Sequence, residues 1–241
     1  METKIVENVM DQEVFESIVQ QKGFYENAAK YWDGIPPTVD GMLGGFGYIS
    51  KTDISGSKLF LKSLFKSQEG LGRERALDCG AGIGRITGNL LANYFDVVDL
   101  VEQNPKFLEQ AKTYLKKSSN KIGKFFSVGL QDFCPEPNTY DVIWCQWVLG
   151  HLNNDDLNKF FHNCKKGLKK NGVLVIKENV TSSNLVEIDE GDSSMTRPYI
   201  GLVEAFKKSG FLCISEEKQQ SMPQGLYPVY MFALRPCDSG S

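Results

Sequence analysis

Short apolar runs of strand length alternate with helix-like stretches through the middle of the chain. The runs are bounded by glycine, proline and polar residues, as buried strands are. They predict strands at 75–79, 97–101, 124–128, 140–145 and 172–177, and the stretches between predict helices at 83–93, 104–116 and 153–169. Strands that alternate with helices favour an α/β fold, built on a mainly parallel sheet with right-handed crossovers.

Both ends of the chain add elements to this pattern. Near the carboxyl end, a helix is expected roughly over 197–209, followed by strands at 211–216 and 226–235. A short link joins those two strands, so they should pair antiparallel. Near the amino end, residues 11–66 predict at least two helices, one of them around 11–32. We therefore expect a seven-stranded, mainly parallel sheet with helices on both faces, an antiparallel terminal hairpin and an N-terminal helical extension.

One domain accommodates all of these elements. We divide it into an N-terminal helical extension with a lid over 1–66, a core over 67–235 and a loose tail over 236–241. The segment 181–197 interrupts the core with a long, polar and acidic stretch. A loop of that length inside a compact domain is either functional or disordered.

Composition narrows the class of protein. Of 241 residues, 41% are hydrophobic and 24% are charged, and the net charge of −3 excludes a strongly basic nucleic-acid binder. No apolar run approaches the ~18–20 residues of a transmembrane helix, and the amino terminus lacks the apolar region of a secretory signal. The six cysteines form no CxxC pair and there are only two histidines, so we expect no metal site. Buried, reduced thiols and a cytoplasmic or nuclear location are expected.

Glycines and acidic residues follow the first two predicted strands. The first strand leads into LDCGAGIGR, where Gly80 and Gly82 let the backbone come close to a ligand. A dinucleotide-binding fingerprint would need a glycine where Arg85 stands, which argues against a Rossmann dehydrogenase. About twenty residues later Glu102 ends the second strand, where a carboxylate can accept both ribose hydroxyls. A GxG turn with Asp78 two residues before it fits a zwitterionic nucleoside ligand.

Two further segments belong to the same edge of the sheet. GLQDF follows the third strand, where Gln131 and backbone groups can read an adenine edge. The fourth strand runs into a loop that exposes Gln146, Trp147 and His151. Ligands of open α/β sheets bind at the carboxyl ends of the strands, so all of these segments are expected around one site.

Together these motifs resemble a known family. GAGIGR, LVE, GLQDF and the fourth-strand block are similar to those of class I S-adenosylmethionine-dependent methyltransferases. From about residue 24 to 235, YW, IPPTVDGMLGG, LDCGAGIGRIT, YDVIW, QWV with GHL, VIKEN and DSS resemble the protein α-N-terminal methyltransferases. Those enzymes methylate the α-amine of proteins that begin X-Pro-Lys/Arg. The chain departs from them at Glu178, where Asp is common, and in a longer loop at 181–191.

The resemblance implies a Rossmann-like methyltransferase sheet, S-adenosylmethionine as cofactor and S-adenosylhomocysteine as product. The implied partners are the N-terminal segments of proteins or peptides, with no nucleic acid and no membrane. Asn179 would orient the amine, and His151 or Asp192 would take its proton, directly or through water. The implied cofactor-binding residues are Gly80, Gly82, Arg85, Glu102, Leu130, Gln131 and Gln146, and the implied peptide-binding residues are Trp32, Leu43, Gly44, Trp147, Asn179, Asp189, Asp192, Ser194 and Tyr227.

Methyl transfer to an α-amine suits such residues. An α-amine has a pKa of about 7.7–8.0, so presenting it uncharged near pH 7 costs only about 1 kcal/mol. Trp32 and Trp147 would flank the X-Pro segment, whereas Trp144, on the strand itself, is expected in the core. Asp189 and Asp192 would pair with a basic third residue, and a glycine-rich cover over 41–45 would close the site.

Two alternatives use the same fold. The first is a methyltransferase for a small amine, hydroxyl or lipid, which would have no need of the acidic loop and the tryptophan pair. The second is a catalytically silent module that retains affinity for the cofactor, against which the intact trio of Asn179, His151 and Asp192 speaks.

Overall fold

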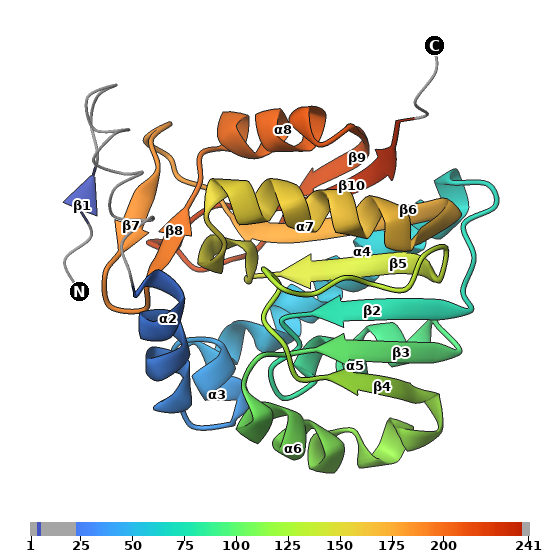
Figure 1. Cartoon of the computed structure of the whole chain (residues 1–241), viewed down its shortest axis with the longest axis horizontal. Helices are drawn as coiled ribbons and strands as arrows, with labels where there is room; N and C mark the ends of the chain where they lie inside the picture. Colours follow the sequence, from blue (N-terminus) through green and yellow to red (C-terminus); the bar gives the residue numbers. More distant parts are fainter. Residues whose placement is uncertain (1–3, 6–22, 238–241) are drawn as a thin grey trace.

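Seven strands form one sheet in the computed structural model, which describes residues 4–5 and 23–237. Side by side they lie in the order β4 (Ile122–Phe126), β3 (Val97–Val101), β2 (Arg75–Cys79), β5 (Tyr140–Gln146), β6 (Leu168–Asn179), β10 (Val229–Pro236) and β9 (Phe211–Lys218) (Figure 1). The first five pair parallel, and β10 pairs antiparallel with both of its neighbours. The predicted mainly parallel sheet and the terminal hairpin are confirmed.

The strand order reverses between β2 and β5. From β2 the chain moves outward to β3 and β4, then returns to the other side of β2 as β5. A crevice opens at such a reversal, outside the carboxyl ends of the two strands. β5 is buried along its whole length, which explains why its sequence reads as an almost continuous apolar run.

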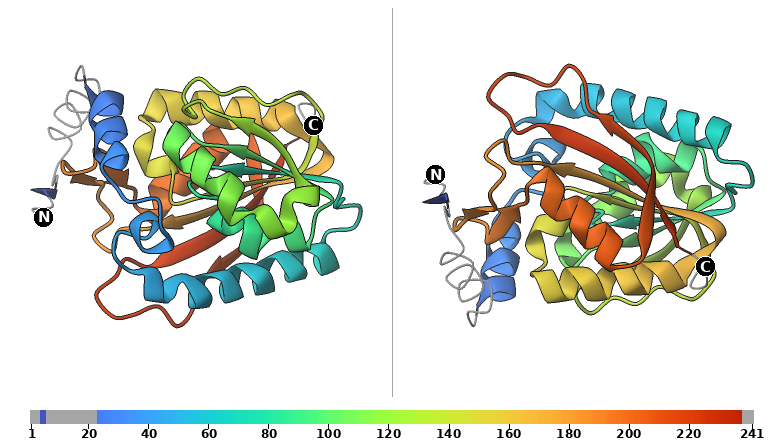
Figure 2. Two further views of the ribbon diagram at one scale, coloured as in Figure 1. Left: turned by 90° about the horizontal axis from the view of Figure 1, so that it is seen from below. Right: turned by 90° about the horizontal axis from the view of Figure 1, so that it is seen from above.

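Helices cover both faces of the sheet. α4 (Ser50–Ser67) lies on one face, and α7 (Asn154–Gly167) and α8 (Tyr199–Lys208) lie on the other (Figure 2). On the first face Leu64 packs in one core with Trp144, which is fully buried as expected. On the second face Phe161 packs in another core with Ile143. Within the described part of the chain, no helix has the length and apolar character to cross a membrane.

The remaining helical elements are α2 (Phe24–Asp33), α3 (Val39–Met42), η1 (Gly47–Ile49), α5 (Arg85–Asn89), η2 (Leu91–Asn93), α6 (Pro105–Tyr114), η3 (Lys116–Lys121) and η4 (Leu149–His151). The single helix expected over 83–93 is wrong, because Leu90 leaves the helical region with φ −124° and ψ −74° and separates α5 from η2. Of the helix expected around 11–32, the part before residue 23 lies outside the described residues, and α2 forms the rest.

The acidic segment 181–197 has secondary structure of its own. β7 (Glu187–Asp189) pairs antiparallel with β8 (Ser194–Thr196), and β1 (Lys4–Ile5) pairs with the other edge of β7. Ile188 and Met195 are buried against Phe24 of α2. These two widely spaced apolar residues anchor the segment beside α2, near the carboxyl ends of the central strands (Figure 1).

Candidate active site

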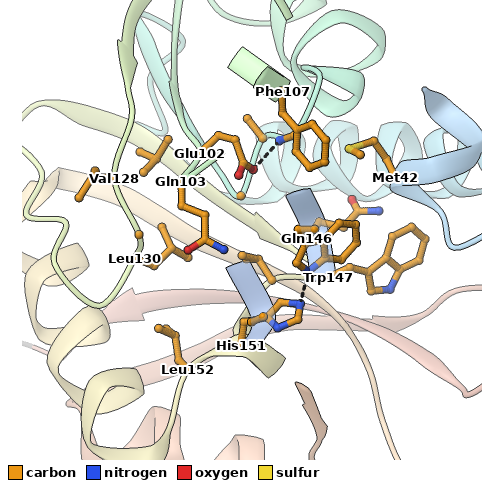
Figure 3. Close-up of a pocket in the computed structure, with 18 of the residues that line it drawn as sticks. Met42, Glu102, Gln103, Phe107, Val128, Leu130, Gln146, Trp147, His151 and Leu152 are labelled. Carbon is orange, nitrogen blue, oxygen red and sulfur yellow. Dashed lines mark hydrogen bonds between the residues drawn. The ribbon is translucent and has the colours of Figure 1, made fainter. Parts of the chain in front are cut away.

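A first cavity, here called the cofactor cavity, lies at the reversal of strand order. Figure 3 shows Glu102 on one side of it and His151 on the other. The cavity is lined by all seven residues to which the sequence assigns cofactor binding: Gly80, Gly82, Arg85, Glu102, Leu130, Gln131 and Gln146.

The glycine turn after β2 forms the floor of this cavity. Gly80 and Gly82 have φ of +69° and +55°, a region that favours glycine. A Cβ at Gly82 would lie 2.6 Å from Met42 Sδ, so a side chain there would also collide with the lid. The turn is held from behind, where the buried carboxylate of Asp78 accepts hydrogen bonds from the Thr87 amide and hydroxyl. Burial raises the pKa of Asp78 to about 7.

Glu102 connects the glycine turn to the next helix. One carboxylate oxygen accepts from the Gly82 amide at 3.0 Å, and the other accepts from the Asn104 amide at 2.8 Å. Burial raises the pKa of this carboxyl group, and the two amides oppose that shift. Glu102 therefore fixes the position of the turn and also lines the cavity where a ribose would lie.

Arg85 and Gln146 share one partner that the sequence did not single out. Arg85 Nη1 lies 2.7 Å from Asp53 Oδ2, and Gln146 Nε2 donates to Asp53 Oδ1 at 2.8 Å. Asp53 itself contacts the ammonium of Lys177. A lysine within the apolar run VLVIK was the available signal, since lysine is almost never fully buried without a partner.

A second cavity, here called the peptide cavity, adjoins the first. It is lined by seven of the nine residues expected to bind peptide: Trp32, Leu43, Trp147, Asn179, Asp192, Ser194 and Tyr227. Gly44 and Asp189 are not part of this lining. Gly44 lies in the turn after α3 with open space around it, and Asp189 accepts a hydrogen bond from the Gly191 amide at 2.8 Å. Their contact with peptide stays a prediction.

Four side chains line both cavities and form the boundary between them: Trp32, Met42, Trp147 and His151. At this boundary Trp32 Nε1 donates to His151 Nε2 at 3.0 Å. Because the indole nitrogen can only donate, His151 carries its proton on Nδ1, which lies 3.4 Å from the Ser193 carbonyl oxygen. Burial lowers the pKa of His151, against an opposing effect of the Asp192 charge, so the ring is neutral at pH 7.

Two buried polar atoms of the peptide cavity have no hydrogen-bond partner among the described residues. They are Asp192 Oδ1 and Trp147 Nε1. Trp147 also has an unusual φ of +53°. Unpaired buried polar atoms are rare in folded proteins, so these two atoms mark a place where a ligand can supply the missing partners.

Two buried charges outside the predicted set hold the loop that carries these boundary residues. Glu178 Oε1 accepts from the Val148 and Leu149 amides at 2.8 and 2.9 Å. Arg197 donates to the Leu149 and Leu152 carbonyls at 2.9 and 2.6 Å. Burial raises the pKa of Glu178 to about 7. Glu178 appeared in the sequence only as a departure from VIKDN, and Arg197 gave no signal.

Tyr227 reaches the cavity from the β9–β10 link, and its hydroxyl donates to Glu187 Oε2 at 2.5 Å. Glu187, in the acidic segment 181–197, thus orients one of the cavity's aromatic residues. Among the described residues, no group of three or more histidines, cysteines and acidic residues could hold a metal ion.

Comparison with known proteins agrees with this geometry. A family model described as "AdoMet dependent proline di-methyltransferase" matches residues 20–235, AdoMet being S-adenosylmethionine. The mouse N-terminal Xaa-Pro-Lys N-methyltransferase 1 is 46% identical over 221 residues, covering 91% of this chain and 99% of that protein. The zebrafish (Danio rerio) protein of the same name is 48% identical over 219 residues, covering 90% and 98%.

Solved structures give the same picture. An S-adenosylmethionine-dependent methyltransferase from Leishmania major superposes with a TM-score of 0.86 and 37% identity, covering 93% of this chain and 90% of that one. The Haemonchus contortus phosphoethanolamine N-methyltransferase 1, solved with S-adenosylhomocysteine, has a TM-score of 0.70 at 15% identity, which shows the fold alone. With a family model that spans most of its length and full-length relatives at 46–48% identity, the chain belongs to the AdoMet-dependent proline di-methyltransferase family.

Proposed function

We propose that the protein transfers a methyl group from S-adenosylmethionine to the α-amino group of proteins that begin X-Pro-Lys/Arg. One observation carries this proposal: a second cavity adjoins the cofactor cavity at a boundary that includes two tryptophans, and Asp192 in its lining has a buried carboxylate oxygen without a partner among the described residues. The partner is the leading segment of a protein or peptide, and the location we expect is the cytoplasm or the nucleus.

S-adenosylmethionine supplies an activated methyl group on a sulfonium. The chain's own residues fit such a molecule: the glycine turn lets a nucleoside approach the backbone, and Glu102 has the acceptor oxygens that ribose hydroxyls need. We assign Arg85 to the carboxylate at the amino-acid end, because a guanidinium offers several donors to one carboxylate. The protein's task is then to hold the amine in line with the methyl carbon and sulfur.

Asp192 is the residue we propose as the principal proton acceptor. The Nε2 atom of His151 already accepts from Trp32, and its Nδ1 atom carries the proton, so the ring has no free acceptor in this arrangement. Asp192 Oδ1 is unpaired and lines the same cavity. It can attract the amine as an ammonium and accept its proton, directly or through water. His151 then holds Trp32 in place, and Asn179 orients the amine without carrying charge.

Specificity for proline at the second position is proposed to come from aromatic surface. Trp32, Leu43 and Trp147 offer apolar faces along the cavity, and a proline ring packs well against such faces. Proline has no amide proton, so the cavity has no need of an acceptor there. This arrangement favours a Pro-containing peptide over a small polar amine.

A basic third residue is proposed to meet the acidic rim of the cavity. The pKa of Tyr31 is raised by burial and then by the charges of Asp192 and Asp189, which therefore lie close to its ring. Two carboxylates near that ring give a favourable position for a lysine or arginine side chain, although an exposed pair of this kind contributes only about 0.2–1 kcal/mol.

A peptide beginning Ser-Pro-Lys, incubated with the protein and S-adenosylmethionine, tests the proposal by mass spectrometry. We expect a mass gain of one or more methyl groups on the α-nitrogen, and none with the α-N-acetylated peptide. A parallel screen of small amines and hydroxyl compounds tests the alternative acceptor class. Methylation of those compounds without methylation of the peptide would refute the proposed function.

A further inference from the structure

A network of buried charges lies directly behind the cofactor cavity. Asp53 on α4 and Lys177 on β6 are both completely inaccessible to solvent. Asp53 Oδ1 lies 2.6 Å from Lys177 Nζ, and Asp53 Oδ2 lies 2.7 Å from Arg85 Nη1. Gln146 Nε2 donates to Asp53 Oδ1 at 2.8 Å. One carboxylate therefore holds two of the residues assigned to the cofactor, Arg85 and Gln146.

Within hydrogen-bonding distance the charges of this network are unequal: Arg85 and Lys177 are two cations that share the one carboxylate of Asp53. The carboxyl groups of Asp78 and Glu217 interact with Arg85 and Lys177 only through space. Burying an uncompensated charge is costly, and an opposite charge at hydrogen-bonding distance offsets that cost. Within the described part of the chain, the Arg85 guanidinium makes its hydrogen bonds through Nη1, to Asp53 and Ser50. The rest of the group lines the cofactor cavity and is available to an anion.

We propose that Asp53 and Lys177 are positioning residues for the amino-acid end of S-adenosylmethionine. Asp53 sets the direction in which Arg85 and Gln146 face the cavity, and Lys177 fixes Asp53. The carboxylate of the cofactor then pairs with the Arg85 guanidinium. This inference rests on the proposed function, because it takes Arg85 as the partner of that carboxylate.

Lys177 also extends the network to the peptide cavity. Its ammonium donates to Ser57 Oγ at 2.9 Å and to Gln219 Oε1 at 2.7 Å. Gln219 comes directly after β9, at the start of the link that supplies Met222, Leu226 and Tyr227 to the peptide cavity. A Cβ at Gly56 would lie 2.1 Å from Gln219 Oε1, so the glycine on α4 makes room for this contact. The same lysine thus anchors walls of both cavities.

Asp53→Asn tests the positioning role because it keeps the shape of the side chain and removes its charge. Burial lowers the pKa of Lys177, and Asp53 opposes that shift. Without Asp53 the pKa of Lys177 should fall further. The substitution also removes the carboxylate that Arg85 and Gln146 share, and with it the group that sets their direction.

Isothermal titration calorimetry with two ligands separates positioning from general damage. S-adenosylhomocysteine contains the amino-acid end, whereas 5′-methylthioadenosine has the same nucleoside and thioether but lacks it. We expect Asp53→Asn to weaken binding of S-adenosylhomocysteine by about tenfold or more, as loss of a charge-assisted hydrogen bond would. Binding of 5′-methylthioadenosine should change by less than about twofold.

Asp99→Asn is the matched control. Asp99 is also buried, accepts from Arg75 Nε and Nη2 at 2.8 and 2.9 Å and from the Tyr140 hydroxyl, and lies away from both cavities. Asp99→Asn should lower the melting temperature. It should leave the ratio of the affinities for S-adenosylhomocysteine and 5′-methylthioadenosine unchanged. Lys177→Met, which removes the ammonium but fills its space, provides a second test variant should Asp53→Asn not fold. Like Asp53→Asn, it should lower the affinity for S-adenosylhomocysteine relative to the affinity for 5′-methylthioadenosine.

The positioning role would be overturned if a folded Asp53→Asn or Lys177→Met protein kept the wild-type ratio of the two ligand affinities. It would also be overturned if Asp99→Asn changed that ratio equally. That result leaves the proposed function intact, provided that the wild type methylates the peptide. Wild-type protein that binds both ligands equally well would instead show that Arg85 does not hold the carboxylate, and it would overturn the inference at its first step.

Discussion

Asp192→Asn is the substitution that examines the proposed chemistry most directly. It keeps the volume of the side chain but removes the charge at the one carboxylate oxygen of the peptide cavity that is buried and unpaired among the described residues. In our proposal this oxygen attracts the α-ammonium of the peptide and accepts its proton. The S-adenosylmethionine site does not include Asp192, so cofactor affinity should be unchanged.

The magnitude follows from the charge pair that is lost. An ammonium about 4 Å from a carboxylate gains about 4 kcal/mol at an effective dielectric constant of 20. Removing one partner of a desolvated, hydrogen-bonded charge pair typically costs 2–5 kcal/mol. We therefore expect kcat/KM for a Ser-Pro-Lys peptide to fall by about 10²–10³, with part of the loss in KM and part in kcat.

Steady-state kinetics and a cofactor titration together form the assay. His151→Gln is the comparison, because the ring nitrogens of His151 already face Trp32 and Ser193, and we expect a smaller loss of about tenfold. Glu109→Gln, at an exposed carboxylate of α6, should leave the kinetics unchanged. A larger loss for His151→Gln than for Asp192→Asn would contradict the role of Asp192 as principal proton acceptor. Equal weakening of cofactor and peptide binding by Asp192→Asn would contradict it as well.

Three further predictions concern other parts of the site. Gly82→Arg should abolish measurable binding of S-adenosylhomocysteine in calorimetry, because φ is +55° and a Cβ would already lie 2.6 Å from Met42 Sδ; retained binding would contradict the cavity assignment. Asp189→Lys should raise KM about threefold to tenfold for X-Pro-Lys peptides and leave X-Pro-Gln peptides unaffected; an equal rise for both peptides would contradict the proposed pairing. Burial raises the pKa of Glu178 to about 7 from 4.5, so the stability that its neutral form gives is present below pH 4.5 and is lost as pH rises through 7, by about 3 kcal/mol. In urea titrations at pH 5 and 7.5, Glu178→Gln should reduce the loss of unfolding free energy between the two pH values. An equal loss in the variant and the wild type would show that Glu178 does not cause it.

Residues at strand ends were predictable because parallel strands bring their carboxyl ends to one edge. Gly80, Glu102, Leu130 and Gln146 each follow or end a different strand, and all four line the cofactor cavity. The strand pattern shows which residues stand at the carboxyl ends of the strands. In a parallel sheet this is enough to predict that those residues lie near one another. Trp147 and His151, in the loop after β5, were expected at the same edge for this reason, and the structure adds that they lie between two cavities.

The lining of the peptide cavity was less predictable than that of the cofactor cavity. Gly44 in the turn after α3 and Asp189 at the end of β7 fall in segments that border the peptide cavity without being part of its lining, and their contact with peptide stays a prediction. β7 and β8 have three residues each, too short for a pattern of period two to stand out. Asp53 is separated from Lys177 by more than 120 residues, and only the folded chain shows that the two belong together.

The two unpaired atoms of the peptide cavity restrict the kind of acceptor further than the aromatic surface does. Asp192 Oδ1 can only accept a hydrogen bond when ionised, and Trp147 Nε1 can only donate one. A ligand that satisfies both atoms needs both a donor and an acceptor. A simple amine offers the donor alone and would leave the indole unpaired, at the usual cost of a buried unsatisfied group. The first residue of a peptide has both an ammonium and a carbonyl. This pairing favours a polypeptide amino terminus over a small amine for a reason independent of the acidic rim and the proline-sized aromatic surface.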